Sequence, residues 1–135
     1  MSLYVDSSAL LKRYVREPES AECERLLHSD AVWVTARHTW VEVQRNLARL
    51  VEGADRGRLQ RAFVEDWKRV HIVELDRDTC DLAGDLAKTH AGIRTLDALH
   101  LAAAQRVGSS AIAFLTYDVR QGRAARELGI KVLGV

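Results

Sequence analysis

Residues 111–135 read AIAFLTYDVRQGRAARELGIKVLGV, and this stretch decides the fold class. The apolar run at 111–116 is typical of a buried strand, and the polar segment at 118–128 has the composition of a helix. Gly129 ends that helix, and the apolar residues 130–135 predict a second strand. A strand, a helix and a strand in direct succession indicate a parallel unit.

The same alternation extends back to the start of the chain. Further strands are predicted at 3–5, 31–35 and 72–75, and further helices at 7–15, 18–28, 39–51, 55–70, 78–90 and 95–106. Gly53 is expected to stop the helix at 39–51, and the helix at 95–106 is apolar on nearly every side, so it should be buried. The pattern predicts a three-layer α/β/α sandwich with a mainly parallel central sheet, formed by a single domain over 1–135.

Composition narrows the class of protein. The 135 residues are 47% hydrophobic and 29% charged, with a net charge of +1, which is ordinary for a folded globular chain and excludes intrinsic disorder. No apolar run could span a bilayer and no secretory signal is present, so we expect a cytoplasmic protein with no membrane contact. Cys23 and Cys80 lie far apart, and no histidine pair has metal-ligand spacing, which argues against a disulfide framework and against zinc.

Four acidic residues fall at one predicted edge of the sheet. Asp6 and Asp118 each come directly after a predicted strand, whereas Glu42 and Asp97 each lie in the first turn of a predicted helix. A helix that leads into a parallel strand runs antiparallel to it, so its first turn lies at the carboxyl edge of the sheet. All four acids therefore map to the edge where open α/β sheets bind ligands.

Four carboxylates in one cleft repel one another. At a separation of about 5 Å and an effective dielectric constant of about 20, each pair costs roughly 3 kcal/mol. A folded domain is stable by only about 5–15 kcal/mol, so such a cluster persists only if carboxylates are protonated, if they spread apart into water, or if a cation binds them. Oxygen ligands favour a hard divalent ion such as Mg²⁺ or Mn²⁺.

Each acid also has a purely structural explanation. Thr39 and Glu42 form the T-x-x-E pattern of a capping box, and Asp97 in a first turn favours the helix dipole. Asp6 and Asp118 can each be a helix N-cap. Capping and catalysis are compatible, so both interpretations stay open at every position.

Four parts of the chain form a recognisable set: VDSSAL at 5–10, Glu42, RTLDALHLA at 94–102 and FLTYD at 114–118. Together they resemble the PIN-domain ribonucleases, and among them the VapC-type toxins of toxin–antitoxin pairs, and the resemblance covers essentially the whole chain. The segments around Asp97 and Asp118 are the most specific.

The resemblance implies a metal-dependent endoribonuclease that acts as the toxin of a type II toxin–antitoxin system. Its catalytic and metal-binding quartet would be Asp6, Glu42, Asp97 and Asp118, which would hold one or two Mg²⁺ or Mn²⁺ ions. Thr116 and Ser7 would support the site with hydroxyl groups. A metal-activated water would cleave RNA to leave a 5′-phosphate and a 3′-hydroxyl. The implied partners are the RNA substrate, a cognate antitoxin and a second copy in a homodimer.

Other residues have two interpretations each. His100 either orients Asp97 or a metal-bound water, or is a core residue. The stripe of Leu59, Phe63, Trp67 and Val70 is either core, a dimer contact or part of an antitoxin groove. Five arginines are candidates to bind RNA phosphates, against the alternative of solvated surface charge: Arg13, Arg37, Arg45, Arg94 and Arg120.

Three alternative functions make different demands on the sequence. A response-regulator receiver needs an acidic pair after its first strand, and a haloacid-dehalogenase phosphatase needs Asp-x-Asp there, whereas this chain has Asp6-Ser7-Ser8. The alternative that stays open is a non-catalytic PIN-like module that only binds RNA or protein.

Overall fold

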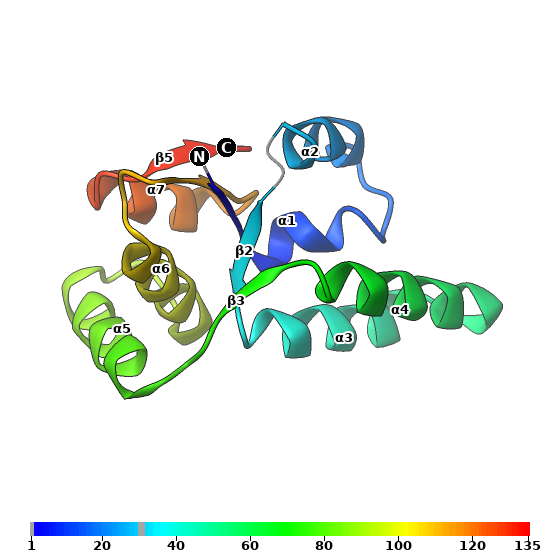
Figure 1. The fold of residues 1–135 in the computed structure, drawn as a ribbon, viewed down its shortest axis with the longest axis horizontal. Coiled ribbons are helices and arrows are strands. Elements are labelled where there is room, and N and C mark those ends of the chain that lie inside the picture. The colour runs from blue at the N-terminus through cyan, green and yellow to red at the C-terminus, as the bar shows by residue number, and fades with distance from the viewer. Residues whose placement is uncertain (1, 30–31) are drawn as a thin grey trace.

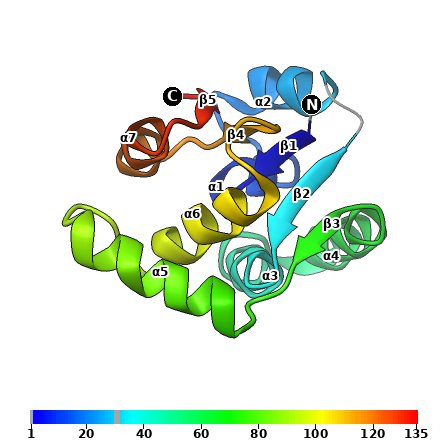
Figure 2. The same ribbon diagram turned by 60° about the vertical axis from the view of Figure 1, so that its left-hand side comes forward.

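Five short strands pair into one sheet in which every neighbouring pair is parallel. A computed structural model describes residues 2–29 and 32–135 of the chain. The strands follow the order β3-β2-β1-β4-β5, and the arrows of β1, β2 and β3 point the same way in Figure 2. Their bounds are β1 Ser2–Val5, β2 Trp33–Ala36, β3 His71–Val73, β4 Ile112–Leu115 and β5 Lys131–Leu133.

Helices cover both faces of this sheet. Helices α5 (Arg77–Thr89), α6 (Thr95–Val107) and α7 (Val119–Glu127) lie on one side of it (Figure 1). The other side carries α1 (Ser7–Leu11), α2 (Ser20–Leu27), α3 (Thr39–Leu50) and α4 (Gly53–Trp67). The α/β/α sandwich predicted from the alternating pattern is confirmed.

Each face of the sheet has its own hydrophobic core. Along β1, Tyr4 packs into the core beneath α5, α6 and α7, whereas Leu3 and Val5 pack into the opposite core. This alternation follows from the period of two along a strand. The small side chains of 102–104 in α6 are fully buried against the sheet, as the apolar composition of that helix predicts.

The aromatic stripe of α4 packs mainly inward. Phe63 is fully buried, and its ring centroid lies 5.3 Å from that of Trp40 and 5.5 Å from that of Tyr14. Trp67 packs against the same cluster, at a centroid distance of 5.5 Å from Phe63. The core interpretation of Phe63 is therefore confirmed.

Several predicted boundaries were wrong. Helix α1 ends at Leu11 rather than at residue 15, because the amides of 12–14 bond to carbonyls three residues back and so tighten the chain into a turn. Gly53, expected only to stop α3, is the first residue of α4, and α4 ends at Trp67, before Val70. Strand β2 begins at Trp33, and the predicted start at residue 31 lies outside the described residues.

No helix in the described part of the chain is long and apolar enough to cross a membrane.

The two cysteines are free thiols in contrasting environments. Cys23 is fully buried and its Sγ donates to the carbonyl oxygen of Ala9 at 3.3 Å, whereas Cys80 is exposed. Burial raises the pKa of Cys23 to about 11.

We therefore expect a disulfide reagent at pH 8 to modify one thiol per native chain quickly and the second only after unfolding, because the thiolate is the reactive form. Absorbance of the released chromophore measures both phases. The control Cys80→Ser should abolish the fast phase alone. Two fast thiols in the native parent would contradict the buried position of Cys23.

Candidate active site

Asp6 is the most enclosed of the four predicted acids. It follows β1 and caps α1, with Oδ1 accepting from the backbone N–H of Ala9 at 3.0 Å and from the hydroxyl of Ser8 at 2.6 Å. Its Oδ2 accepts from the hydroxyl of Thr116 at 2.5 Å and from Nε2 of Gln121 at 3.3 Å. The predicted N-cap role is confirmed, and four donors from two segments converge on one carboxylate.

Burial raises the pKa of Asp6, although the hydrogen bonds and the nearby His100 act in the opposite direction. Only 2% of its surface is exposed, so the ionised carboxylate loses most of its hydration. A cation beside it would restore a favourable environment for the negative charge.

Asp118 lies next to Asp6 in the hydrogen-bond network. It caps α7, and its Oδ1 accepts from the backbone N–H groups of Arg120 at 2.9 Å and Gln121 at 3.2 Å. Its own backbone N–H donates to the hydroxyl oxygen of Thr116 at 3.0 Å. The Thr116 hydroxyl therefore joins both caps, donating to Asp6 and accepting from Asp118.

The backbone of Gly134 packs closely against the carbonyl group of Thr116. It follows β5 with a φ of +99°, which favours glycine, and an added Cβ would collide with the carbonyl oxygen of Thr116.

Asp97 is half-buried in the first turn of α6. Its Oδ2 accepts from the backbone N–H of Arg94 at 3.1 Å, so it closes the start of the helix. This placement agrees with the helix-dipole explanation and keeps Asp97 at the carboxyl edge of the sheet.

Glu42 does not form the capping box that its sequence pattern predicts. Thr39 is buried and its hydroxyl pairs with that of Thr35 at 2.7 Å, and the N-cap is His38, which makes no capping bond through its side chain. Glu42 Oε1 instead accepts from Nε2 of His100 at 2.9 Å. The expected capping box was wrong because Thr39 bonds to Thr35 and Glu42 bonds to His100, and neither side chain bonds to the backbone at the start of α3.

Two imidazoles set the charge of Glu42. Burial raises its pKa, but the hydrogen bond from His100 and the charges of His100 and His38 outweigh burial, so the pKa lies below its usual value. His38 Nε2 lies 3.5 Å from Glu42 Oε1, and burial together with the His100 charge lowers the pKa of His38 to about 4. The pKa of Glu42 is therefore lowered, whereas the pKa of Asp6 is raised.

Among the described residues, the side chain of His100 forms hydrogen bonds with Glu42 and Tyr4. It is buried, its Nδ1 accepts from the hydroxyl of Tyr4 at 2.8 Å, and its Nε2 donates to Glu42. The interpretation that His100 orients Asp97 was therefore wrong, because the carboxylate that His100 contacts is that of Glu42.

The supporting hydroxyls divide between two acids. Thr116 contacts Asp6, as does Ser8, whereas the hydroxyl of Ser7 helps to lower the pKa of Glu42. Gln121 was missed by sequence reasoning, although its position three residues after Asp118 places it in the first turn of the same helix.

The donor set fits a hard divalent cation. All four acids lie at helix starts at the carboxyl edge, and the buried Oε1 of Gln121 has no hydrogen-bond partner among the described residues. That carbonyl offers an acceptor for a cation or for one of its waters. In the described chain, however, the group whose ligand atoms all lie within 4.8 Å of one another is His38, Glu42 and His100 rather than the acidic quartet.

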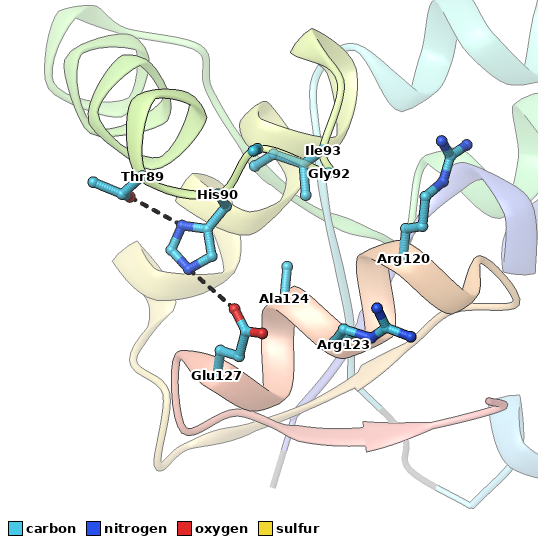
Figure 3. A pocket seen from close by; sticks show the side chains of 9 residues that line it. Thr89, His90, Gly92, Ile93, Arg120, Arg123, Ala124 and Glu127 are labelled. Atoms are coloured by element: carbon cyan, nitrogen blue, oxygen red, sulfur yellow. Dashed lines mark hydrogen bonds and ion pairs between the residues drawn. The ribbon is translucent and has the colours of Figure 1, made fainter.

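A surface pocket of about 270 Å³ opens beside this edge (Figure 3). It lies between the connection from α5 to α6 and helix α7, and an ion pair of His90 with Glu127 at 3.6 Å borders one side. Arg120 and Arg123 project from α7 at the other side. None of the four carboxylates lines the pocket, but Arg120 lies two residues after Asp118.

A parallel sheet with acidic residues at its carboxyl edge defines a class of α/β domains that bind ligands at that edge, and residues 3–127 match the PIN domain family. The chain belongs to the PIN-domain family. It is 38% identical to "Ribonuclease VapC46" of Mycobacterium tuberculosis, covering 98% of this chain and 96% of that protein. It is 34% identical to "Ribonuclease VapC47" of the same species, covering 94% and 92%.

Solved structures share the fold. The FitAcB structure from Neisseria gonorrhoeae has a TM-score of 0.74 at 18% identity, covering 98% of this chain and 96% of that one. The structure of Mycobacterium tuberculosis VapC20, described as a sarcin-ricin loop cleaving toxin, has a TM-score of 0.74 at 17% identity, covering 98% of each chain.

The Asp6→Asn variant should fold and should melt a few degrees above the parent at pH 7 in EDTA. Asparagine keeps the acceptor for Ala9 and Ser8, and Gln121 can turn its unpaired Oε1 toward the new amide. Because the folded-state pKa of Asp6 is raised, its contribution to stability is full below about pH 3.9 and is lost as pH rises. The gap between variant and parent should therefore widen from pH 4 to pH 7 in thermal melts.

Asp76→Asn is the matched control. Asp76 caps α5 by accepting from the backbone N–H of Thr79 at 2.9 Å, but it is exposed and the Thr79 bonds lower its pKa. Its contribution is present above about pH 3.9 and is lost as pH falls, so this variant should melt below the parent at pH 7. Equal pH behaviour of the two variants would show that burial does not control Asp6.

Proposed function

We propose that this chain is a Mg²⁺- or Mn²⁺-dependent endoribonuclease and the toxin of a type II toxin–antitoxin pair. The observation that carries the proposal is the convergence of Asp6 and Asp118 on one Thr116 hydroxyl at the carboxyl edge of a PIN-domain sheet. We further propose that the whole chain acts as a single PIN-like domain in the cytoplasm. The relatives named as ribonucleases support RNA as the substrate.

The residues of the site have separable roles in this proposal. Asp6, Asp97, Asp118 and Glu42 would hold one or two cations, which when bound acidify a water and offset the charge that develops on the phosphate. Thr116 would hold the Asp6 carboxylate and the backbone N–H of Asp118 on one hydroxyl group, while the Asp118 carboxylate is held by the backbone of α7. The hydrogen bond from His100 would fix the orientation of the Glu42 carboxylate.

An apolar rim around the acids supports an antitoxin partner. Val41, Leu96 and Val119 are exposed by 64%, 45% and 63%, and they lie in the first turns of α3, α6 and α7 beside Glu42, Asp97 and Asp118. Exposed apolar side chains are typical contact residues where a partner protein binds. Structures with similar folds include a toxin–antitoxin complex from Klebsiella pneumoniae and DNA-bound VapBC from Salmonella typhimurium. A homodimer remains part of the proposal.

The purified chain should cleave structured RNA in Mg²⁺ or Mn²⁺ and be silent in EDTA. Asp6→Asn and Asp97→Asn should each lower the cleavage rate by at least about a hundredfold, because each removes a charged ligand. Gel analysis of labelled RNA measures the rate, and growth arrest of a bacterial host that expresses each protein is a second readout. Cleavage in EDTA would overturn the metal mechanism. Well-folded parent protein that binds RNA without cutting it would favour the non-catalytic alternative.

Arg120 should contribute to RNA binding and Arg37 should not. Arg13 is paired with Glu24 and Asp66, and Arg37 with Glu74, whereas no carboxylate of the described chain pairs with Arg120. In an Asp97→Asn background, which prevents cleavage, Arg120→Ala should weaken RNA binding about two- to tenfold and reduce the salt slope by about one.

Arg37→Ala is the control, since it removes the same charge from an arginine that already has a partner. Fluorescence anisotropy of labelled RNA at several salt concentrations measures both variants. Equal weakening by the two would show that only net charge matters.

A further inference from the structure

Two histidines far apart in sequence meet at one carboxylate oxygen. His38 Nε2 lies 3.5 Å from Glu42 Oε1, and His100 Nε2 lies 2.9 Å from the same atom. The two imidazole centroids are 4.1 Å apart, and the ligand atoms of the three residues all lie within 4.8 Å of one another. No histidine pair has metal-ligand spacing along the sequence, but in the structure the side chains of His38 and Glu42 at the start of α3 meet His100 of α6.

His38 is not satisfied by its protein surroundings alone. Its side chain is 9% exposed, its Nε2 donates to the carbonyl oxygen of Leu96 at 3.2 Å, and its buried Nδ1 has no partner in the described chain. The carbonyl oxygen can only accept, so Nε2 carries the ring proton in this arrangement and the buried Nδ1 holds a lone pair without a donor. A cation bound at Nε2 would replace the bond to the Leu96 carbonyl, and the ring proton would then lie on Nδ1.

His100 has the outer partner that metal-binding histidines usually have. Tyr4 Oη lies 2.8 Å from His100 Nδ1. A phenol can donate or accept, so Tyr4 Oη can also accept a hydrogen bond from Nδ1–H when Nε2 turns its lone pair toward a cation. Such a hydrogen bond fixes the orientation of a ligating imidazole.

We propose that His38, Glu42 and His100 form a site for a borderline transition-metal cation, with Zn²⁺ as the best match. Two imidazole nitrogens and one carboxylate oxygen are the donor set of open zinc sites, whereas hard cations prefer oxygen alone. The Glu42 side chain is 19% exposed, which gives an ion access and leaves room for a water as a fourth ligand. The site shares Glu42 with the acidic quartet, so its cation competes with the hard cation for that charge.

Binding can be measured without any ribonuclease assay. The chain, purified without a polyhistidine tag and stripped with EDTA that is then removed, is titrated with Co²⁺ as a coloured substitute for Zn²⁺. The parent should develop the visible absorption of a low-coordinate Co²⁺ complex that one equivalent of Zn²⁺ bleaches. His38→Gln should weaken binding at least about tenfold, the loss seen when even outer-sphere partners are removed. Glutamine can keep the bond to the Leu96 carbonyl, and a thermal melt checks its fold.

Two matched variants make the result decisive. His28→Gln removes an exposed histidine that lies 3.4 Å from Glu24, so it should leave Co²⁺ binding unchanged. Asp97→Asn, which weakens the acidic site, should also retain tight Co²⁺ binding. If His38→Gln and the parent bind equally, or if Asp97→Asn alone loses binding, the cation sits on the carboxylates and the proposal is overturned. Should His38→Gln fail to fold, His100→Gln takes its place under the same criteria.

The shared carboxylate gives a second, separate readout. In Mg²⁺, micromolar Zn²⁺ should inhibit RNA cleavage by the parent and inhibit His38→Gln at least about tenfold less potently. Equal inhibition of both proteins would overturn the competition. A chain that binds Co²⁺ through His38 but never cleaves RNA would retain the metal site while refuting the proposed ribonuclease function.

Discussion

The hydroxyl group of Thr116 is the interaction on which the site depends. It donates to Asp6 and accepts from the backbone of Asp118, and so links the caps of α1 and α7. This link exists because β1 and β4 pair in parallel with Val5 opposite Leu115. The residues just beyond the two strand ends are then neighbours, although more than a hundred positions separate them in sequence. Any change of register by one residue would part them.

The site handles its negative charge in two different ways. Asp6 is surrounded by neutral donors in a dry environment, so burial raises its pKa. Glu42 lies against two imidazoles, which lower its pKa. One carboxylate therefore gains from an added cation while the other is already stabilised by the protein. Because of this difference, a hard cation would stabilise the site mainly at Asp6, whereas Glu42 lies next to the nitrogen ligands of His38 and His100.

Local patterns predicted those parts of the molecule that local physics controls. The parallel sheet, the capping roles of Asp6 and Asp118 and the buried α6 follow from strand periodicity, N-cap chemistry and apolar composition. The capping box at Glu42 was wrong because His100 competes for its carboxylate. Gln121 and His38 were missed for the same reason: their partners come from other elements, and a distance along the chain does not report a distance across a packed interface.

Gly134 affects the site although it carries no side chain and lies after the last strand. A side chain there would push against the carbonyl of Thr116, and the displacement would pass to the hydroxyl that both caps share. In a genetic selection for loss of function, position 134 would therefore behave like an active-site residue without ever touching RNA. A residue of this protein can therefore be needed for the active site because it positions Thr116, even though it takes no part in the chemistry.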